Sequence, residues 1–213
     1  MLALDQSREL LAMVRARAER LGVSHRITTQ PTNLDEGLKG APLIDIAWAG
    51  TVLHHLADPA GFLRELHAAL RPGGLLAITE FGPPSRTLPE DLGFGDTGFE
   101  QRYNDAVRAA IEAHLAPGAL HVDWATALSE AGFEVLVERV LLVDMAAPIP
   151  ETVRRWMAND FERTATMVRD KLSDSDQATL AVLMDATDPR GLMHRSDLAL
   201  QAGRSLHVAR KPA

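Results

Sequence analysis

The order of apolar and polar positions predicts strands and helices in alternation from the first residue. MLALD is typical of a strand that ends at Asp5, and Ser7 suits the N-cap of a helix. Apolar residues then recur at helical spacing as far as Gly22, a residue type that often ends helices. A short strand is expected at RITT, residues 26–29. This order is the beginning of an α/β pattern.

Residues 44–79 predict a second unit, in which two strands flank a helix. IDIAWA, residues 44–49, is an apolar run that predicts a strand buried on both faces. Asp58-Pro59 suits a helix start, and Pro72-Gly73-Gly74 is expected to end that helix before the buried strand LLAIT. The unit has the size of a parallel crossover, so we expect a parallel sheet.

The second half of the chain predicts more helix. A loop rich in glycine and proline covers residues 81–98, and a helix is expected at about 99–115. Residues 122–145 predict a helix, a stop at Gly132 and a long strand. Two helical segments and a last strand follow, at about 151–171, 174–187 and 204–211. The apolar faces expected of the two helices are Met157, Phe161, Thr164, Val168 and Leu172, and Leu180, Leu183, Met184 and Thr187.

Composition narrows the function classes. Of 213 residues, 46% are hydrophobic and 24% are charged, which is typical of a folded globular protein. The net charge of −7 leaves no basic surface for counterion release from nucleic acid. The absence of cysteine excludes disulfides and thiolate metal sites. With no apolar run of membrane-spanning length, we expect a cytoplasmic protein that binds neither nucleic acid nor membrane.

Taken together, LALDQSRELL, DIAWAGTVLHHLADP and LRELHAALRPGGLLAITE resemble the class I S-adenosylmethionine-dependent methyltransferases. The resemblance extends to ALSEAGFEVLVERVLL and RSLHVARK, which match the family's sixth and seventh strands. It implies an α/β, Rossmann-like sheet, mostly parallel with an antiparallel last strand. Residues 1–213 would form one N-terminally truncated domain with a cofactor-binding core at 1–81. Substrate-side or lid insertions would lie at 82–120 and 147–200, the latter helical and before the last strand.

The resemblance places S-adenosylmethionine at the ends of the early strands. Asp5, followed by Gln6, matches the acidic residue that accepts hydrogen bonds from both ribose hydroxyls, a role that suits the two oxygens of a carboxylate. The alternative is that Asp5 only begins a helix, where the dipole favours negative charge. Asn33 and Leu34 fall where the family has an acidic residue and an apolar one at the adenine. Asn33 departs from that pattern, although its amide oxygen can accept the same bond, and it can equally be a plain loop residue.

Ala49 and Gly50 match the strand end that approaches the methionine part of the cofactor, since small residues allow close approach. They are also common at any strand end. His54-His55 predicts no metal site, because adjacent residues do not face one ion and no partner has ligand spacing. A packed structural role is the favoured interpretation, and the alternative is that one His reaches the substrate pocket. Glu80 could accept a proton from a substrate or cap a loop, and the three tryptophans, Trp48, Trp124 and Trp156, are expected in the core or in a pocket wall.

One expected feature is missing from these residues. The family's first strand ends in a glycine-rich turn before the acidic residue, but only four residues precede Asp5 and none is glycine. We expect either a start at an internal Met of a longer product or a remnant that binds the cofactor poorly, and we favour the first. The second and fourth strands of the family would be left with unpaired edges, which predicts weak cofactor binding and an unstable or homo-oligomeric sheet.

The sequence therefore predicts methyl transfer from S-adenosylmethionine to a small-molecule acceptor, with oxygen, nitrogen and carbon acceptors left open. No catalytic residue is identified, because alignment and exclusion of water suffice for an activated methyl donor. An alternative is a non-catalytic binding or dimerisation module with the same fold. A nicotinamide-dependent dehydrogenase is disfavoured, since no GxGxxG is present and the Pro-Gly-Gly turn follows the wrong strand.

Overall fold

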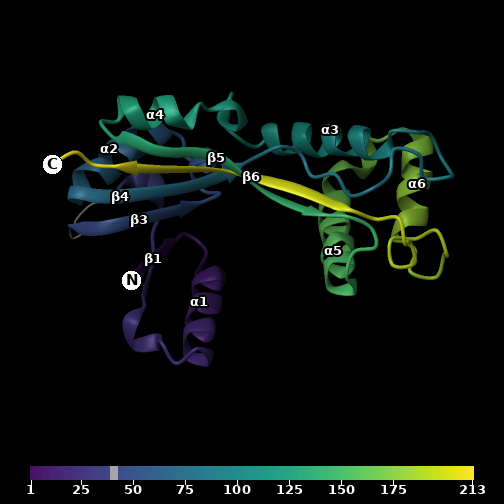
Figure 1. The fold of residues 1–213 in the computed structure, drawn as a ribbon, viewed down its shortest axis with the longest axis horizontal. Helices are drawn as coiled ribbons and strands as arrows, with labels where there is room; N and C mark the ends of the chain where they lie inside the picture. Colours follow the sequence, from purple (N-terminus) through teal and green to yellow (C-terminus); the bar gives the residue numbers. More distant parts are fainter. Residues whose placement is uncertain (39–42) are drawn as a thin grey trace. The chain divides into compact units, whose positions relative to one another are not determined.

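The computed structural model describes residues 1–38 and 43–213, which form two compact units (Figure 1). The first unit contains residues 1–77, 123–136 and 208–213. The second contains residues 78–122 and 137–207, and so includes all of segments 82–120 and 147–200. None of the described helices is both long and apolar enough to span a membrane.

The first unit begins with a strand, a helix and a strand, as the sequence predicts. Strand β1 (Leu2–Asp5) pairs in parallel with β2 (Thr28–Pro31), and helix α1 (Arg8–Arg20) packs on both. The Ser7 hydroxyl accepts from the Leu10 N–H at 3.2 Å, and Gly22 follows the helix with φ +69°. β2 begins two residues later than expected because residues 24–26 form a 3₁₀ turn.

The second crossover is also present, with one correction. Strand β3 (Ile44–Gly50) leads to helix α2 (Pro59–Ala69), which Asp58 caps by accepting from the Gly61 N–H at 2.8 Å. Strand β4 (Leu70–Phe81) begins at once. The expectation that Pro72-Gly73-Gly74 is a separate turn between helix and strand is therefore wrong. These residues extend β4, because the Gly73 N–H and the Gly74 carbonyl both bond Lys211, at 2.9 Å each.

A mixed sheet is completed by the end of the chain. Helix α4 (Trp124–Glu130) precedes β5 (Glu134–Met145), and β6 (Leu200–Arg210) is the last strand. The strand order is β3-β4-β6-β5. Arg210 bonds Glu134 at one end of the β5–β6 pair, and Gln201 bonds Asp144 at the other, so β6 is antiparallel to β5. Helices α2 and α4 contact each other over this sheet (Figure 1).

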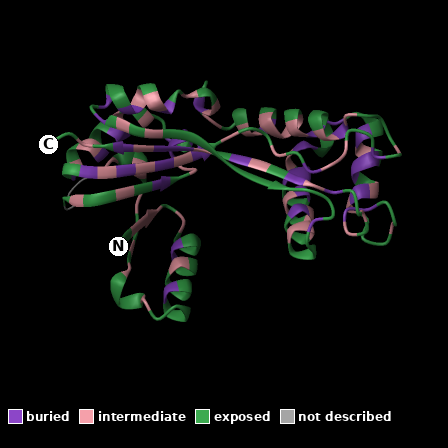
Figure 2. Cartoon of the chain, in the orientation of Figure 1, coloured by how far each residue is buried: buried purple, intermediate pink, exposed green. Residues whose placement is uncertain are grey.

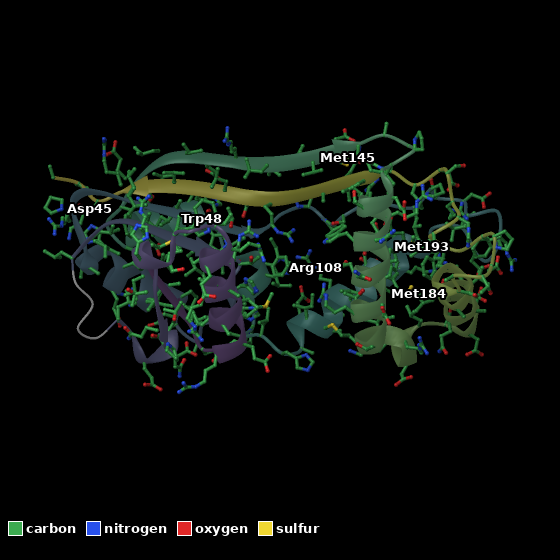
Figure 3. All side chains as sticks on the ribbon, turned by 90° about the horizontal axis from the view of Figure 1, so that it is seen from below. Asp45, Trp48, Arg108, Met145, Met184 and Met193 are labelled. Atoms are coloured by element: carbon green, nitrogen blue, oxygen red, sulfur yellow. The ribbon has the colours of Figure 1, made fainter. Side chains whose placement is uncertain are left out.

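β1 and β3 belong to different sheets among the described residues. β1 pairs with β2 in a two-stranded sheet, whereas β3 is the edge of the four-stranded one. The expectation that residues 44–49 are buried on both faces is wrong, since Ile46 is 69% exposed and Trp48 is 70% exposed. Much of β3 is coloured as exposed in Figure 2, and Figure 3 labels Asp45 and Trp48 on this strand. An apolar run indicates a strand but not what covers it.

The second unit is built mainly from three helices. They are α3 (Phe99–Glu112), α5 (Glu151–Val168) and α6 (Asp174–Met184), which contact one another. The predicted face of α5 is buried, as are Leu180 and Leu183 of α6, whereas Thr187 lies beyond the helix and is exposed. The shared core includes Phe99, Tyr103, Met157, Phe161, Val168, Leu180, Leu183 and Leu198. Apolar packing between these helices is therefore what holds this unit together.

Candidate functional site

The carboxyl ends of β1 and β2 form one edge, at which the first predicted site residues lie. Asp5 is opposite Pro31 in the register, and the Thr32 N–H donates to the Asp5 carbonyl at 2.9 Å. Asn33 and Leu34 follow directly. Because the strands are parallel, the ribose and adenine candidates of the sequence analysis come from neighbouring strand ends.

Asp5 is half-buried, and its Oδ1 accepts from the Ser7 N–H at 2.7 Å. This bond supports the start of α1, as the helix-start interpretation requires. A carboxylate has about four acceptor positions, so one local bond still allows a bidentate contact with a diol. Gln6 beside it is exposed.

Asn33 is engaged within its own loop. Its Oδ1 accepts from the Asp35 N–H and its Nδ2 donates to Glu36 Oε1, both at 3.2 Å, which starts the 3₁₀ turn Leu34–Glu36. Leu34 is half-buried. The plain loop interpretation of Asn33 is thus observed, while the second lone pair of Oδ1 keeps an acceptor for a base.

Asp35 makes a contact near this edge that sequence reasoning missed. Its Oδ1 accepts from the Ala57 N–H at 2.9 Å, which joins the loop after β2 to the segment that follows β3. A charged acceptor makes this a stronger bond than a neutral one. The only signal in the sequence is the position of an acidic residue in a short polar loop, which does not identify a partner 22 residues away.

The end of β3 is the third part of this site. Ala49 is buried and Gly50 is exposed. Thr51 has φ +52°, a left-handed conformation that is unfavourable for a β-branched residue. Such strain is concentrated at binding sites, and no sequence pattern revealed it. The 3₁₀ turn Leu53–His55 follows, with His54 buried and its ring centroid 4.0 Å from that of His55.

The three tryptophans were expected in the core or in a pocket wall. Trp124 is buried and Trp156 lines a cavity, as expected, whereas Trp48 is 70% exposed, so the expectation is wrong for Trp48. Glu80 is buried within β4. Among residues 1–38 and 43–213, no three His, Asp or Glu side chains form a group that could hold a metal ion.

The second unit contains a cavity of about 60 Å³ between α3, α5 and the loop before α3. Three aromatic residues line it together with Glu100 and Asp160. The aromatic residues are Tyr103, Trp156 and Phe161. Tyr103 and Phe161 are buried and stack with ring centroids 5.0 Å apart, whereas Trp156 is half exposed. Apolar walls and a few polar groups are typical of small-molecule sites.

Glu100 is held firmly in this wall. Its Oε1 accepts from both the N–H and the hydroxyl of Thr87, at 2.7 and 2.5 Å, and its Oε2 accepts from the Leu88 N–H at 3.2 Å. Burial raises the pKa of the Glu100 carboxyl, and these hydrogen bonds partly oppose the rise. With three of about four acceptor positions used, Oε2 has room for one further donor.

The hydroxyl groups of Tyr103 and Thr164 form a hydrogen-bonded network in the same cavity wall as Glu100. The Tyr103 hydroxyl lies 2.7 Å from Thr164 Oγ1 and 3.1 Å from the Phe161 carbonyl, and the Thr164 hydroxyl donates to the Asp160 carbonyl at 2.7 Å. Burial raises the pKa of Tyr103 above its ordinary value. Tyr103 is therefore a neutral wall residue rather than a base near pH 7.

Comparisons with known proteins agree with this architecture. Residues 1–76 match a family model described as a methyltransferase domain. A solved structure of a putative methyltransferase from Bacillus halodurans matches all of this chain and 83% of its own, with 19% identity and a TM-score of 0.57. The [4+2]-cyclase SpnF matches all of this chain and 66% of its own, with 20% identity and a TM-score of 0.50.

A phosphoethanolamine N-methyltransferase 2 from Haemonchus contortus is also similar. It was solved with phosphomonomethylethanolamine and S-adenosylhomocysteine, and matches all of this chain but 43% of its own, with 15% identity and a TM-score of 0.50. Identities this low establish the fold alone, and one neighbour is a cyclase by name.

Proposed function

We propose that this chain methylates a small-molecule acceptor. It has the Rossmann-like fold of the class I S-adenosylmethionine-dependent methyltransferases, and its residues 1–76 match a methyltransferase domain family. The observation that carries the proposal is the bonding of three strand ends. Thr32 bonds Asp5, and Asp35 bonds Ala57, so the loops after β1, β2 and β3 are linked. Ligands bind at such carboxyl ends in α/β sheets.

The residues present fit the nucleoside part of S-adenosylmethionine. Asp5 would accept from the ribose hydroxyls, with Gln6 exposed beside it. Asn33 would accept from the adenine amino group while Leu34 packs on the ring. Ala49 and Gly50, followed by the strained Thr51, would allow the backbone to approach the methionine part.

The cofactor, when bound, supplies a methyl group already activated on a sulfonium. The protein then needs to hold the acceptor in line and exclude water. In the reaction, an acceptor lone pair forms the new bond to the methyl carbon, the carbon–sulfur bond breaks, and its electron pair stays on sulfur. The cavity between α3 and α5 is the proposed acceptor site, since it lies in the segments expected on the substrate side.

The test is methyl transfer from radiolabelled S-adenosylmethionine to a panel of small oxygen, nitrogen and carbon acceptors. Residues 1–213 would be compared with the Asp5→Ala variant and with the control Asp45→Ala, an exposed carboxylate on β3. We expect labelled product from the wild type and from Asp45→Ala, and much less from Asp5→Ala, because the proposed ribose acceptor is lost. Absence of both product and cofactor binding in the wild type would contradict the proposal.

A second candidate is a non-catalytic binding or dimerisation module. The observation in its favour is the edge strand β3, whose Ile46 and Trp48 are exposed. Exposed apolar strand edges favour association. A dimer at micromolar concentration that binds no S-adenosylmethionine, measured by sedimentation and calorimetry, would favour this candidate.

A further inference from the structure

The cavity in the second unit has an unusual balance of charge. Two acidic residues, Glu100 and Asp160, are among its lining residues, and its described lining contains no Lys, Arg or His. Two arginines act on these residues from outside that lining. Arg163 pairs with Asp160 on the surface, where its side chain is mostly exposed and the pair is weakened by solvent, and Arg86 acts on Glu100 only through its field.

The walls of the cavity suit the same kind of ligand. The rings of Tyr103 and Phe161, which stack on each other, and the half-exposed ring of Trp156 are part of the wall, and aromatic rings carry electron-rich faces. Such faces attract cations, and most strongly those that are poorly hydrated, such as alkylated ammonium groups. Aromatic faces and carboxylates in one small cavity therefore favour a positive organic group over a neutral or anionic one.

The polar contacts leave room for that group. Three hydrogen bonds hold the Glu100 carboxylate in place, and one acceptor position on Oε2 is left. The Tyr103 and Thr164 hydroxyls are used within the wall. Further side-chain donors in the described lining, such as the Ser85 hydroxyl and the second N–H of the Asn104 amide, are neutral. A protonated amine would find a charged acceptor in Glu100.

We propose that the cavity lined by Glu100, Tyr103, Trp156 and Asp160 binds a small organic cation, a protonated amine or its methylated ammonium form. This inference rests on the proposed function in so far as the bound amine is the methyl acceptor. Its ammonium N–H then gives its proton to the Glu100 carboxylate before the nitrogen lone pair forms the new bond to the methyl carbon. The inference narrows the acceptor from any small molecule to a nitrogen compound.

The test uses the full chain and two probes of similar size, tetramethylammonium chloride and neutral tert-butanol, at equal ionic strength. Calorimetry is expected to show roughly ten-fold tighter binding of tetramethylammonium. Glu100→Gln removes the charge but keeps an acceptor for Thr87, and it should weaken tetramethylammonium binding roughly five- to twenty-fold while changing tert-butanol binding less than about two-fold. Asp105→Asn is the matched control, because Asp105 is an exposed carboxylate on the same helix outside the cavity, and it should change neither.

Asp160→Asn and Trp156→Leu provide further variants if Glu100→Gln does not fold, and each should also weaken tetramethylammonium selectively. Equal binding of the two probes, or an Asp105→Asn effect as large as that of the cavity variants, would overturn the inference. S-adenosylmethionine is titrated into the same samples. Binding of the cofactor without the cation overturns only this inference, whereas binding of the cation without the cofactor contradicts only the proposed function.

Discussion

The carboxylate of Asp35 accepts a hydrogen bond from the backbone N–H of Ala57, with 2.9 Å between Oδ1 and N. It joins the loop after β2 to the segment after β3, although these strands belong to different sheets. The bond therefore fixes the spacing between the adenine candidates, Asn33 and Leu34, and the strand end at Gly50.

Asp35→Ala should lower the free energy of unfolding by about 1–2 kcal/mol, because a charge-assisted bond is lost. Urea denaturation measures the change. Asp35→Asn retains an oxygen acceptor and should therefore keep at least half of the stability that Asp35→Ala loses. Equal loss in both variants would show that the charge, rather than the bond to Ala57, is what matters.

Thr51→Asn should stabilise the protein by about 1 kcal/mol, because asparagine tolerates the left-handed conformation better than a β-branched residue. Thr152→Asn is the control, since Thr152 is exposed on α5 and should change stability by less than about 0.5 kcal/mol. If the strain serves cofactor binding, Thr51→Asn also weakens binding. An unchanged or lower stability would mean that φ +52° costs little here.

The ion pair between Arg102 and Asp176 predicts a dependence of stability on pH. Asp176 is 3% exposed and accepts from Arg102 Nε at 3.0 Å and Nη2 at 2.7 Å, and these bonds lower the pKa of its carboxyl. A pKa lower in the folded state gives stability that is present above the unfolded value of about 3.9 and is lost as pH falls through the folded value. Asp176→Asn should cost roughly 1–3 kcal/mol at pH 7 and progressively less as pH falls below about 3.9.

Glu100 acts in the opposite sense. Its pKa is raised, so its contribution is present below the ordinary value of about 4.3 and is lost as pH rises through the folded value. Glu100 is present in both the wild type and Asp176→Asn. Subtracting their free energies of unfolding at each pH therefore cancels its contribution. Asp105→Asn again serves as the control. If the difference in free energy of unfolding between the wild type and Asp176→Asn does not change between pH 7 and pH 3, the pH dependence does not come from Asp176.

Local sequence patterns predict which residues form helices and strands, whereas the contacts around those elements are known only from the structure. The caps at Ser7 and Asp58 are contacts within three residues, so sequence alone located both helix starts. The Pro-Gly-Gly segment was misassigned because Lys211, which holds it in β4, lies 137 residues beyond Gly74 by numbering, 211 minus 74. No local pattern contains that pairing.

The candidate site divides in the same way. Asp5 ends β1 and Gly50 ends β3, as predicted, and Asn33 lies in the loop after β2. It could not reveal the bond from Asp35 to Ala57 or the positive φ of Thr51, which depend on how separate loops meet. The exposure of Trp48 was unpredictable for a similar reason, since an apolar pattern does not report what covers a strand.

Asp5 is the residue that we propose holds the ribose of S-adenosylmethionine. Titration calorimetry of the cofactor into the protein tests this role, with Asp5→Asn and the control Asp45→Asn, an exposed carboxylate on β3. The amide oxygen introduced by Asp5→Asn would still accept from the Ser7 N–H, so the fold should persist. We predict roughly ten- to hundred-fold weaker binding for Asp5→Asn and no change for Asp45→Asn. Equal affinity of Asp5→Asn and the wild type would contradict the account.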